Sequence, residues 1–116
     1  MQTKNNRLLR VGENIRAILS ENLLSNDINI QELSDDVIIT ITEVQPSKDL
    51  RYAKAYVSSL GEDEKKVSEI LNNYSNVFSK LVAKQIETKY SPKISFFPDL
   101  SFQTASKINT LINASK

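Results

Sequence analysis

Two neighbouring runs in the middle of the chain have the pattern of β-strands, and they constrain the fold more than any other feature. The first, "VIITITEV" (residues 37–44), is rich in β-branched residues, which fit the pleated surface of a sheet. In the second, "LRYAKAYVS" (residues 50–58), small apolar residues alternate with tyrosine and lysine, as in a strand with one buried face. A proline, a serine and an aspartate lie between the runs, so we predict a hairpin with a short turn. Ala53 and Ala55 on the inward face predict that a helix packs closely there.

Apolar residues at helical spacing lie on both sides of this hairpin. They predict an amphipathic helix over about residues 6–24. After the hairpin, Asp63 and Glu64 suit the start of a helix, and apolar residues then recur every three or four positions as far as Ile86. "KISFF" (residues 93–97) follows a proline that ends the helical pattern, and we predict a third strand there. The order α-β-β-α-α-β predicts an α+β domain whose three-stranded sheet is covered by helices on one face.

Polar residues interrupt the second helical region. "LNNYSNVFSKLVAKQI" (residues 71–86) has apolar residues at helical spacing but gathers asparagines and serines in its first third. These side chains compete for the backbone and disfavour helix interiors, and asparagine tolerates a left-handed backbone. We therefore predict that one helix ends and another begins at Tyr74-Ser75-Asn76, with an angle between them.

The helix after this break carries a row of polar and basic side chains. Asn76, Lys80 and Lys84 are spaced four residues apart and so share one face, while the exposed N–H groups at a helix start attract phosphate. One interpretation is a contact with a nucleic-acid backbone. The other is a kinked surface helix whose lysines serve solubility, and from spacing alone this is the more common case.

The residue types that are missing exclude several classes of function. The chain has no cysteine and no histidine, which excludes disulfides, thiolate or imidazole metal ligands and Ser-His-Asp catalysis. No glycine-rich phosphate loop occurs. The acid pairs Asp35-Asp36 and Asp63-Glu64 fall in a predicted loop and at a predicted helix start, where capping and solubility explain them. We expect a protein that is not an enzyme and needs no cofactor and no metal.

Charge is unevenly distributed along the chain. The first 20 residues carry four basic side chains and one acidic one, the middle of the chain is acidic, and residues 71–116 carry six lysines and two acids. Basic ends that meet in space would favour a polyanionic partner. No apolar run is long enough to span a membrane and the N-terminus lacks a signal-peptide core, so we expect a cytoplasmic protein without a membrane partner.

Several stretches in a fixed order resemble the ribosome-binding factor A family, bacterial maturation factors of the small (30S) ribosomal subunit. "RLLRVGENIRAILSENL" (residues 7–23) resembles the family's opening helix. "ITITEVQPSKDLRYAKAYVS" (residues 39–58) resembles its hairpin pattern, VTVTxVxxSxDLxxAxVYVS. "LNNYSNVFSKLV" and "IETKYSPKISFFPD" resemble LNxAxGxxRxxL and LxxRxxPxLxFxxD. The resemblance covers about Arg7 to Asp99.

The chain departs from the family pattern at the break. The family usually has Ala-x-Gly where this chain has Tyr74-Ser75-Asn76, and often an arginine where this chain has Ser79 beside Lys80. Asparagine adopts the left-handed conformation less readily than glycine, and lysine lacks the two-pronged phosphate contact of arginine. These differences concern the RNA contacts more than the fold.

The resemblance implies a type II KH-like fold, α-β-β-α-(kink)-α-β. KH domains hold nucleic-acid backbone at the break between two helices. It also implies a factor that binds the immature 30S subunit and 16S rRNA, assists late maturation and 16S rRNA 5′-end processing, and supports growth in the cold. We expect a monomer with no DNA partner, and RNA contacts from seven residues: Arg7, Arg10, Ser75, Asn76, Lys80, Lys84 and Lys89.

The predicted domain is a single KH-like unit over residues 1–99, with its core at about 6–99. An extension, residues 100–116, follows as an amphipathic helix or a frayed tail. Two other functions stay open. One is a KH-like regulator that binds other RNA, and the other is a protein–protein adaptor that uses the acidic middle and the apolar C-terminal segment.

Aromatic and basic residues also share the outward face of the hairpin, where Tyr52, Lys54 and Tyr56 alternate with the alanines. Base stacking is one interpretation. The other is ordinary strand propensity on a solvent face, which we prefer at this point because KH-like sheets are not generally stacking surfaces. Of Phe96 and Phe97, one is expected to enter the core.

Overall fold

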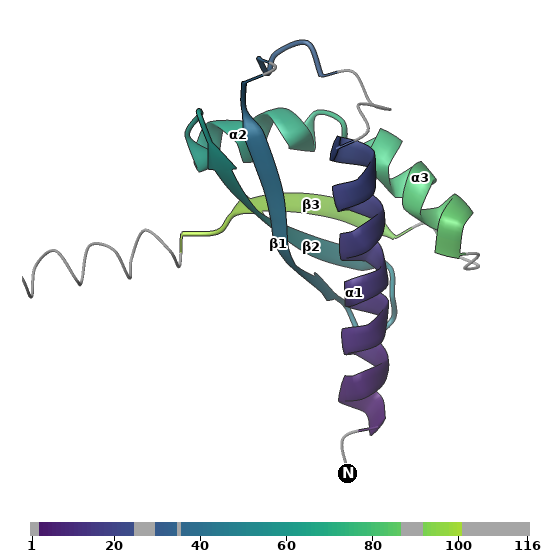
Figure 1. Ribbon diagram of the computed structural model, residues 1–116. Coiled ribbons are helices and arrows are strands. Elements are labelled where there is room, and N and C mark those ends of the chain that lie inside the picture. The colour runs from purple at the N-terminus through teal and green to yellow at the C-terminus, as the bar shows by residue number, and fades with distance from the viewer. Residues whose placement is uncertain (1–2, 25–29, 35, 87–91, 101–116) are drawn as a thin grey trace, which may run out of the picture.

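The order of elements along the chain is the one that the sequence predicts. The computed structural model describes residues 3–24, 30–34, 36–86 and 92–100; Lys89 and most of the predicted extension, residues 101–116, lie outside them. The elements are α1 (Thr3–Leu24), β1 (Ile38–Pro46), β2 (Tyr52–Leu60), α2 (Glu64–Asn72), α3 (Ser75–Ile86) and β3 (Lys93–Pro98) (Figure 1). The predicted α+β class and the type II KH-like arrangement α-β-β-α-α-β are confirmed.

The three strands form one mixed sheet in the order β1-β2-β3. β1 and β2 are the predicted antiparallel hairpin, with a bulge between Ile41 and Glu43, and β3 lies parallel to β2. In the turn between β1 and β2, the Asp49 carboxylate accepts hydrogen bonds from the Ser47 hydroxyl at 2.7 Å and from the Arg51 N–H at 3.1 Å. These bonds lower the pKa of Asp49, the serine hydroxyl most of all. The aspartate thus fixes the turn.

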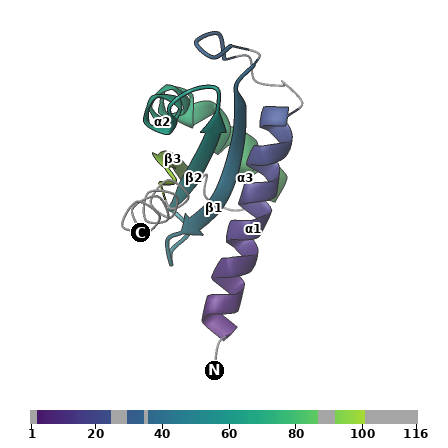
Figure 2. The same ribbon diagram turned by 60° about the vertical axis from the view of Figure 1, so that its left-hand side comes forward.

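The helices of the described part of the chain cover one face of the sheet. Ala53, Ala55 and Val57 on β2 are fully buried, and the three helices lie against this face (Figures 1 and 2). The small side chains allow the close helix packing that the sequence predicts. The rings of Phe78 on α3 and Phe96 on β3 meet edge to face at 5.2 Å. Large side chains from all three helices and from β1 and β3 complete the core: Ile15, Leu19, Ile41, Val67, Leu71, Val82 and Ile94.

Helix α1 approaches β1 unusually closely. A Cβ atom at Gly12 would lie 2.5 Å from the carbonyl oxygen of Val44, well inside van der Waals contact. Only glycine therefore permits this packing of helix on strand. The N-terminal turns of α1 extend past the end of the sheet (Figures 1 and 2).

The break between α2 and α3 falls earlier than predicted, at Asn73 and Tyr74. Asn73 has φ −66° and ψ −20°, which is right-handed, and Asn76 lies inside α3. The predicted break is confirmed at Tyr74, but Ser75 and Asn76 belong to α3 and Asn76 is not left-handed. The physical reason is that the Asn73 and Tyr74 N–H groups bond back to the carbonyls of Ile70 and Leu71 at 3.1 and 2.9 Å. Such a tightened last turn ends a helix without a left-handed residue.

Candidate nucleic-acid interface

The polar residues around the break face the outer edge of β3. The Asn72 side chain pairs with the backbone of Phe96: its Nδ2 donates to the carbonyl at 2.9 Å, and its Oδ1 accepts from the N–H at 2.7 Å. One turn along, the Ser75 hydroxyl donates to the carbonyl of Ile94. The Ser79 hydroxyl accepts from the Ile94 N–H at 3.0 Å. Four backbone groups on the open side of β3 thus have side-chain partners.

This arrangement explains why poor helix formers gather here. An edge strand presents unpaired backbone groups that must be bonded or protected. The next residue of β3 whose backbone points to the open edge of the sheet is Pro98, which has no N–H to bond. Asn72, Ser75 and Ser79 have helical spacing, three and four residues apart, and this was the sequence signal that the prediction missed. The hydroxyl of Ser75, which was expected at the RNA, points into the protein, so only its backbone N–H remains for an outward contact.

The predicted row on α3 is fully on the outside. Asn76, Lys80 and Lys84 are exposed, on the side of the helix opposite the buried Phe78 and Val82. The helix contains no acidic residue. Neither lysine forms an ion pair with any residue in the described part of the chain. The row therefore carries positive charge at the molecular surface that no described carboxylate pairs with.

Helix α1 contributes two further cations to the same layer. Arg7 and Arg10 are exposed and also lack ion pairs with described residues. A small cavity is lined by both Val11 of α1 and Ile86 of α3, so the end of α3 that carries Lys84 lies beside the first half of α1. The structure thus brings these cations into one helical layer (Figure 1).

A third arginine on α1, Arg16, forms an ion pair within the helix. Both the Nε and one terminal nitrogen of Arg16 donate to the Glu13 carboxylate, at 2.9 and 2.7 Å. Its charge is therefore compensated, whereas Arg7 and Arg10 have no ion-pair partner among the described residues.

One carboxylate lies close to the break. The Tyr74 hydroxyl donates to Glu32 at 2.8 Å, and this hydrogen bond, together with burial and the negative charge of Glu32, raises the pKa of Tyr74. The contact ties the loop before β1 to the start of α3. Among the described residues, Glu32 forms no ion pair with the lysines further along α3.

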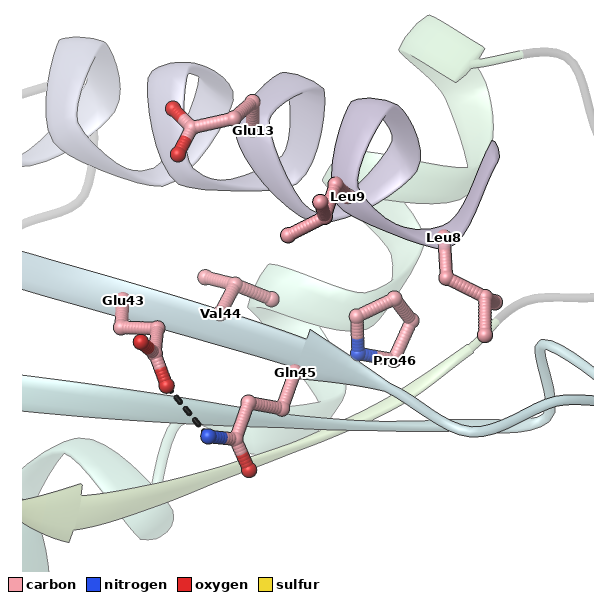
Figure 3. A pocket seen from close by; sticks show the side chains of 7 residues that line it. All are labelled: Leu8, Leu9, Glu13, Glu43, Val44, Gln45 and Pro46. Atoms are coloured by element: carbon pink, nitrogen blue, oxygen red, sulfur yellow. Dashed lines mark hydrogen bonds between the residues drawn. The ribbon is translucent and has the colours of Figure 1, made fainter. Parts of the chain in front are cut away.

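A groove on the other side of α1 does not belong to this basic layer. It has a volume of about 490 Å³ and lies between the start of α1 and the end of β1 (Figure 3). Leu8, Leu9, Val44 and Pro46 point into it and make it apolar, whereas the carboxylates of Glu13 and Glu43 point away from it (Figure 3). An apolar groove without a cation does not fit a nucleic-acid backbone.

Among the residues with described positions, no group of three or more acidic, histidine or cysteine side chains is arranged to hold a metal ion. No helix in the described ranges has the length and apolar character needed to cross a membrane.

Known proteins with similar sequences and structures agree with one another. The sequence model of the family described as ribosome-binding factor A matches residues 7–112. A ribosome-binding factor A from Novosphingobium aromaticivorans is 42% identical, over 96% of this chain and 82% of that protein. The solution structure of a candidate ribosome-binding factor A from Thermotoga maritima matches with a TM-score of 0.62 at 34% identity, over 73% of this chain and 79% of that one.

A third similar protein is known in a complex. It is the ribosome-binding factor A of Thermus thermophilus, as a homology model fitted into a cryo-EM map of a 30S complex. It matches with a TM-score of 0.57 at 22% identity, over 75% of this chain and 89% of that one. At that identity, the likeness supports the fold alone.

Proposed function

This chain belongs to the ribosome-binding factor A family, and we propose that it binds the 30S subunit through the outer surface of helices α1 and α3. The observation that carries the proposal is the row of Asn76, Lys80 and Lys84, which is exposed and faces away from the core. The Thermus thermophilus member of the family, fitted into a map of a 30S complex, supports the choice of partner.

The basic layer would hold the phosphates of 16S rRNA. Lysine binds phosphate as a point charge, without requiring one fixed geometry, and this suits recognition of a folded RNA surface more than of a base sequence. The first N–H groups of α3, including that of Ser75, have no acceptor within their own helix and favour an anion. Arg7 and Arg10 would extend the contact along α1, and Lys89 is proposed as a further contact.

The biological role follows from the partner. We propose that the chain acts on the immature subunit in the cytoplasm, assists late maturation including 16S rRNA 5′-end processing, and does so as a monomer without catalysing a reaction. Residues 1–99 would form the working domain. A binding role needs only an accessible basic surface and a rigid scaffold, and α3 is held rigidly by its bonds to β3.

Co-sedimentation with purified 30S subunits over a series of salt concentrations tests this proposal. The test variant is Asn76→Ala/Lys80→Ala/Lys84→Ala. The matched control, Lys48→Ala/Lys65→Ala, removes the same number of positive charges at exposed positions in the hairpin turn and on α2. A second test variant, Arg7→Ala/Arg10→Ala, examines α1.

We expect the wild type and the control to bind in a salt-sensitive way and the α3 variant to lose most of its binding. If the α3 variant binds like the control while the α1 variant does not, the partner is right and the α3 surface is wrong. If the wild type binds neither mature nor immature subunits at low salt, the proposed partner itself is wrong.

A further inference from the structure

The face of the sheet that no described helix covers has a composition unlike an ordinary solvent face. Strands β2 and β3 pair in register so that Tyr52 lies beside Lys93, Lys54 beside Ser95, and Tyr56 beside Phe97. These six outward residues, here called the β2–β3 platform, comprise three aromatic rings, two lysines and one serine. None is acidic.

The rings and cations of the platform contact one another. The Tyr56 and Phe97 rings lie 5.9 Å apart and are tilted by 36°. The Nζ atom of Lys54 lies 5.8 Å from the centre of the Phe97 ring. Tyr52 is 58% exposed and Phe97 is 40% exposed, which is high for side chains of this size. Within the described part of the chain, no carboxylate lies within ion-pair distance of Lys54 or Lys93.

Two carboxylates border the platform on its β1 side. Glu43, on β1, is the register partner of Tyr56 and accepts a hydrogen bond from Gln45. The Asp99 carboxylate accepts one from the Thr42 hydroxyl at 2.6 Å. Both carboxylates therefore contact β1 side chains. The lysines lie on β2 and β3, so the platform is polarised, with its positive side along the β2–β3 pair.

We propose that the β2–β3 platform binds an unpaired RNA segment, whose bases stack on Tyr56 and Phe97 and whose phosphates lie near Lys54 and Lys93. Exposed rings interleaved with cations are what single-stranded nucleic acid requires, because every base has a flat face and every linkage a negative charge. The inference rests on the proposed function only in naming RNA as the nucleic acid. The platform and the basic layer of α1 and α3 lie on opposite faces of the sheet, so one molecule can engage folded rRNA and an unpaired strand together.

Fluorescence anisotropy with two probes tests the platform. One probe is a short unstructured RNA oligonucleotide, and the other is an abasic phosphodiester of the same length, which keeps the charge and removes the bases. The wild-type chain is expected to bind the RNA about tenfold or more tightly than the abasic probe, since stacking on an aromatic residue contributes on this scale.

Three variants separate stacking from charge. Tyr56→Leu/Phe97→Leu keeps apolar bulk without flat rings, and we expect it to bind both probes equally. Lys54→Ala/Lys93→Ala should weaken binding of both probes while preserving their ratio. Lys80→Ala/Lys84→Ala, on the opposite face of the sheet, should also keep the ratio.

Two outcomes overturn the inference. One is equal binding of the two probes by the wild type, and the other is a preference for bases that survives in the leucine variant with an unchanged circular dichroism spectrum. If the leucine variant unfolds at a lower temperature and the wild type shows no preference for the RNA over the abasic probe, the two rings stabilise the fold by packing and do not bind RNA. Because 30S co-sedimentation uses the other face, its failure and the failure of the platform are distinguishable.

Discussion

The most specific structural claim is that Asn72 closes the outer edge of β3, and replacing it with alanine tests that claim. The substitution removes two hydrogen bonds to the backbone of Phe96, of 2.9 and 2.7 Å. A protein hydrogen bond contributes a net ~1 kcal/mol, so the pair accounts for about 2 kcal/mol. Alanine is the better helix former by about 0.5 kcal/mol. We therefore expect Asn72→Ala to lower the free energy of unfolding by about 1.5 kcal/mol.

The neighbouring asparagine provides a matched control. Asn73 is exposed, has helical backbone angles, and makes no side-chain hydrogen bond to a described residue. Asn73→Ala should therefore change stability by less than about 0.5 kcal/mol. Urea unfolding of both variants, with the slope of the transition unchanged, gives the comparison.

Amide hydrogen exchange gives a second readout of the same claim. The Phe96 amide should exchange faster in Asn72→Ala, since its acceptor is gone, and should be unchanged in Asn73→Ala. Equal stabilities for the two variants, or an unchanged Phe96 exchange rate, would refute the edge-closing role.

Three further predictions concern other parts of the molecule. Gly12→Ala should lower the free energy of unfolding, measured in urea, by about 1–3 kcal/mol, because the new Cβ would lie 2.5 Å from a β1 carbonyl oxygen. Alanine normally stabilises a helix, so an unchanged stability would contradict the close approach of α1 to β1. The pKa of Asp49 is lowered from 3.8 in the folded chain. The ionised Asp49 carboxylate therefore stabilises the fold above pH 3.8, and this stabilisation is lost as pH falls through the lower folded-state pKa. An NMR titration of the Asp49 carboxyl carbon with a midpoint at or above 3.8 would contradict this. Lys80→Ala/Lys84→Ala should reduce the salt dependence of 30S binding by about one to two units in the slope of log K against log salt, and an unchanged slope would mean that these lysines contact no phosphate.

The fold was predictable because local patterns agree with one another. The alternation in β2 and the apolar spacing of α1 each point to one buried face, and the small residues Ala53 and Ala55 predict the helix layer that covers it. The turn at Asp49 also follows from residue types alone. Where several levels of sequence signal agree, the native structure has few competitors.

The break was harder to predict, because its chemistry depends on a distant strand. Asparagine and serine near Tyr74 indicated an interruption, but local propensity alone did not show that Asn76 would lie inside the second helix. The structure ends α2 at Asn72 with a tight turn and directs the polar side chains to the edge of β3, more than twenty residues further along. A single sequence does not show which strand a polar helix face will meet.

The candidate site was predicted only in part, because it too depends on contacts between distant segments of the chain. The lysine row follows from helical spacing and is exposed as expected, whereas the hydroxyl of Ser75 turned out to be bonded inside the protein. The sequence also places Tyr52, Lys54 and Tyr56 on one face. It does not reveal that Phe97 and Lys93 join them, because that depends on the parallel register of β2 and β3.

The central claim is that the outer surface of α1 and α3 faces the 30S subunit. Acetylation of surface lysines, quantified by mass spectrometry with and without 30S subunits, tests it most directly on the unaltered chain. The account predicts that Lys80 and Lys84 become protected when the subunit is present, while Lys48 in the hairpin turn and Lys65 on α2 react as before. Protection of Lys48 and Lys65 with continued reaction at Lys80 and Lys84 would contradict it.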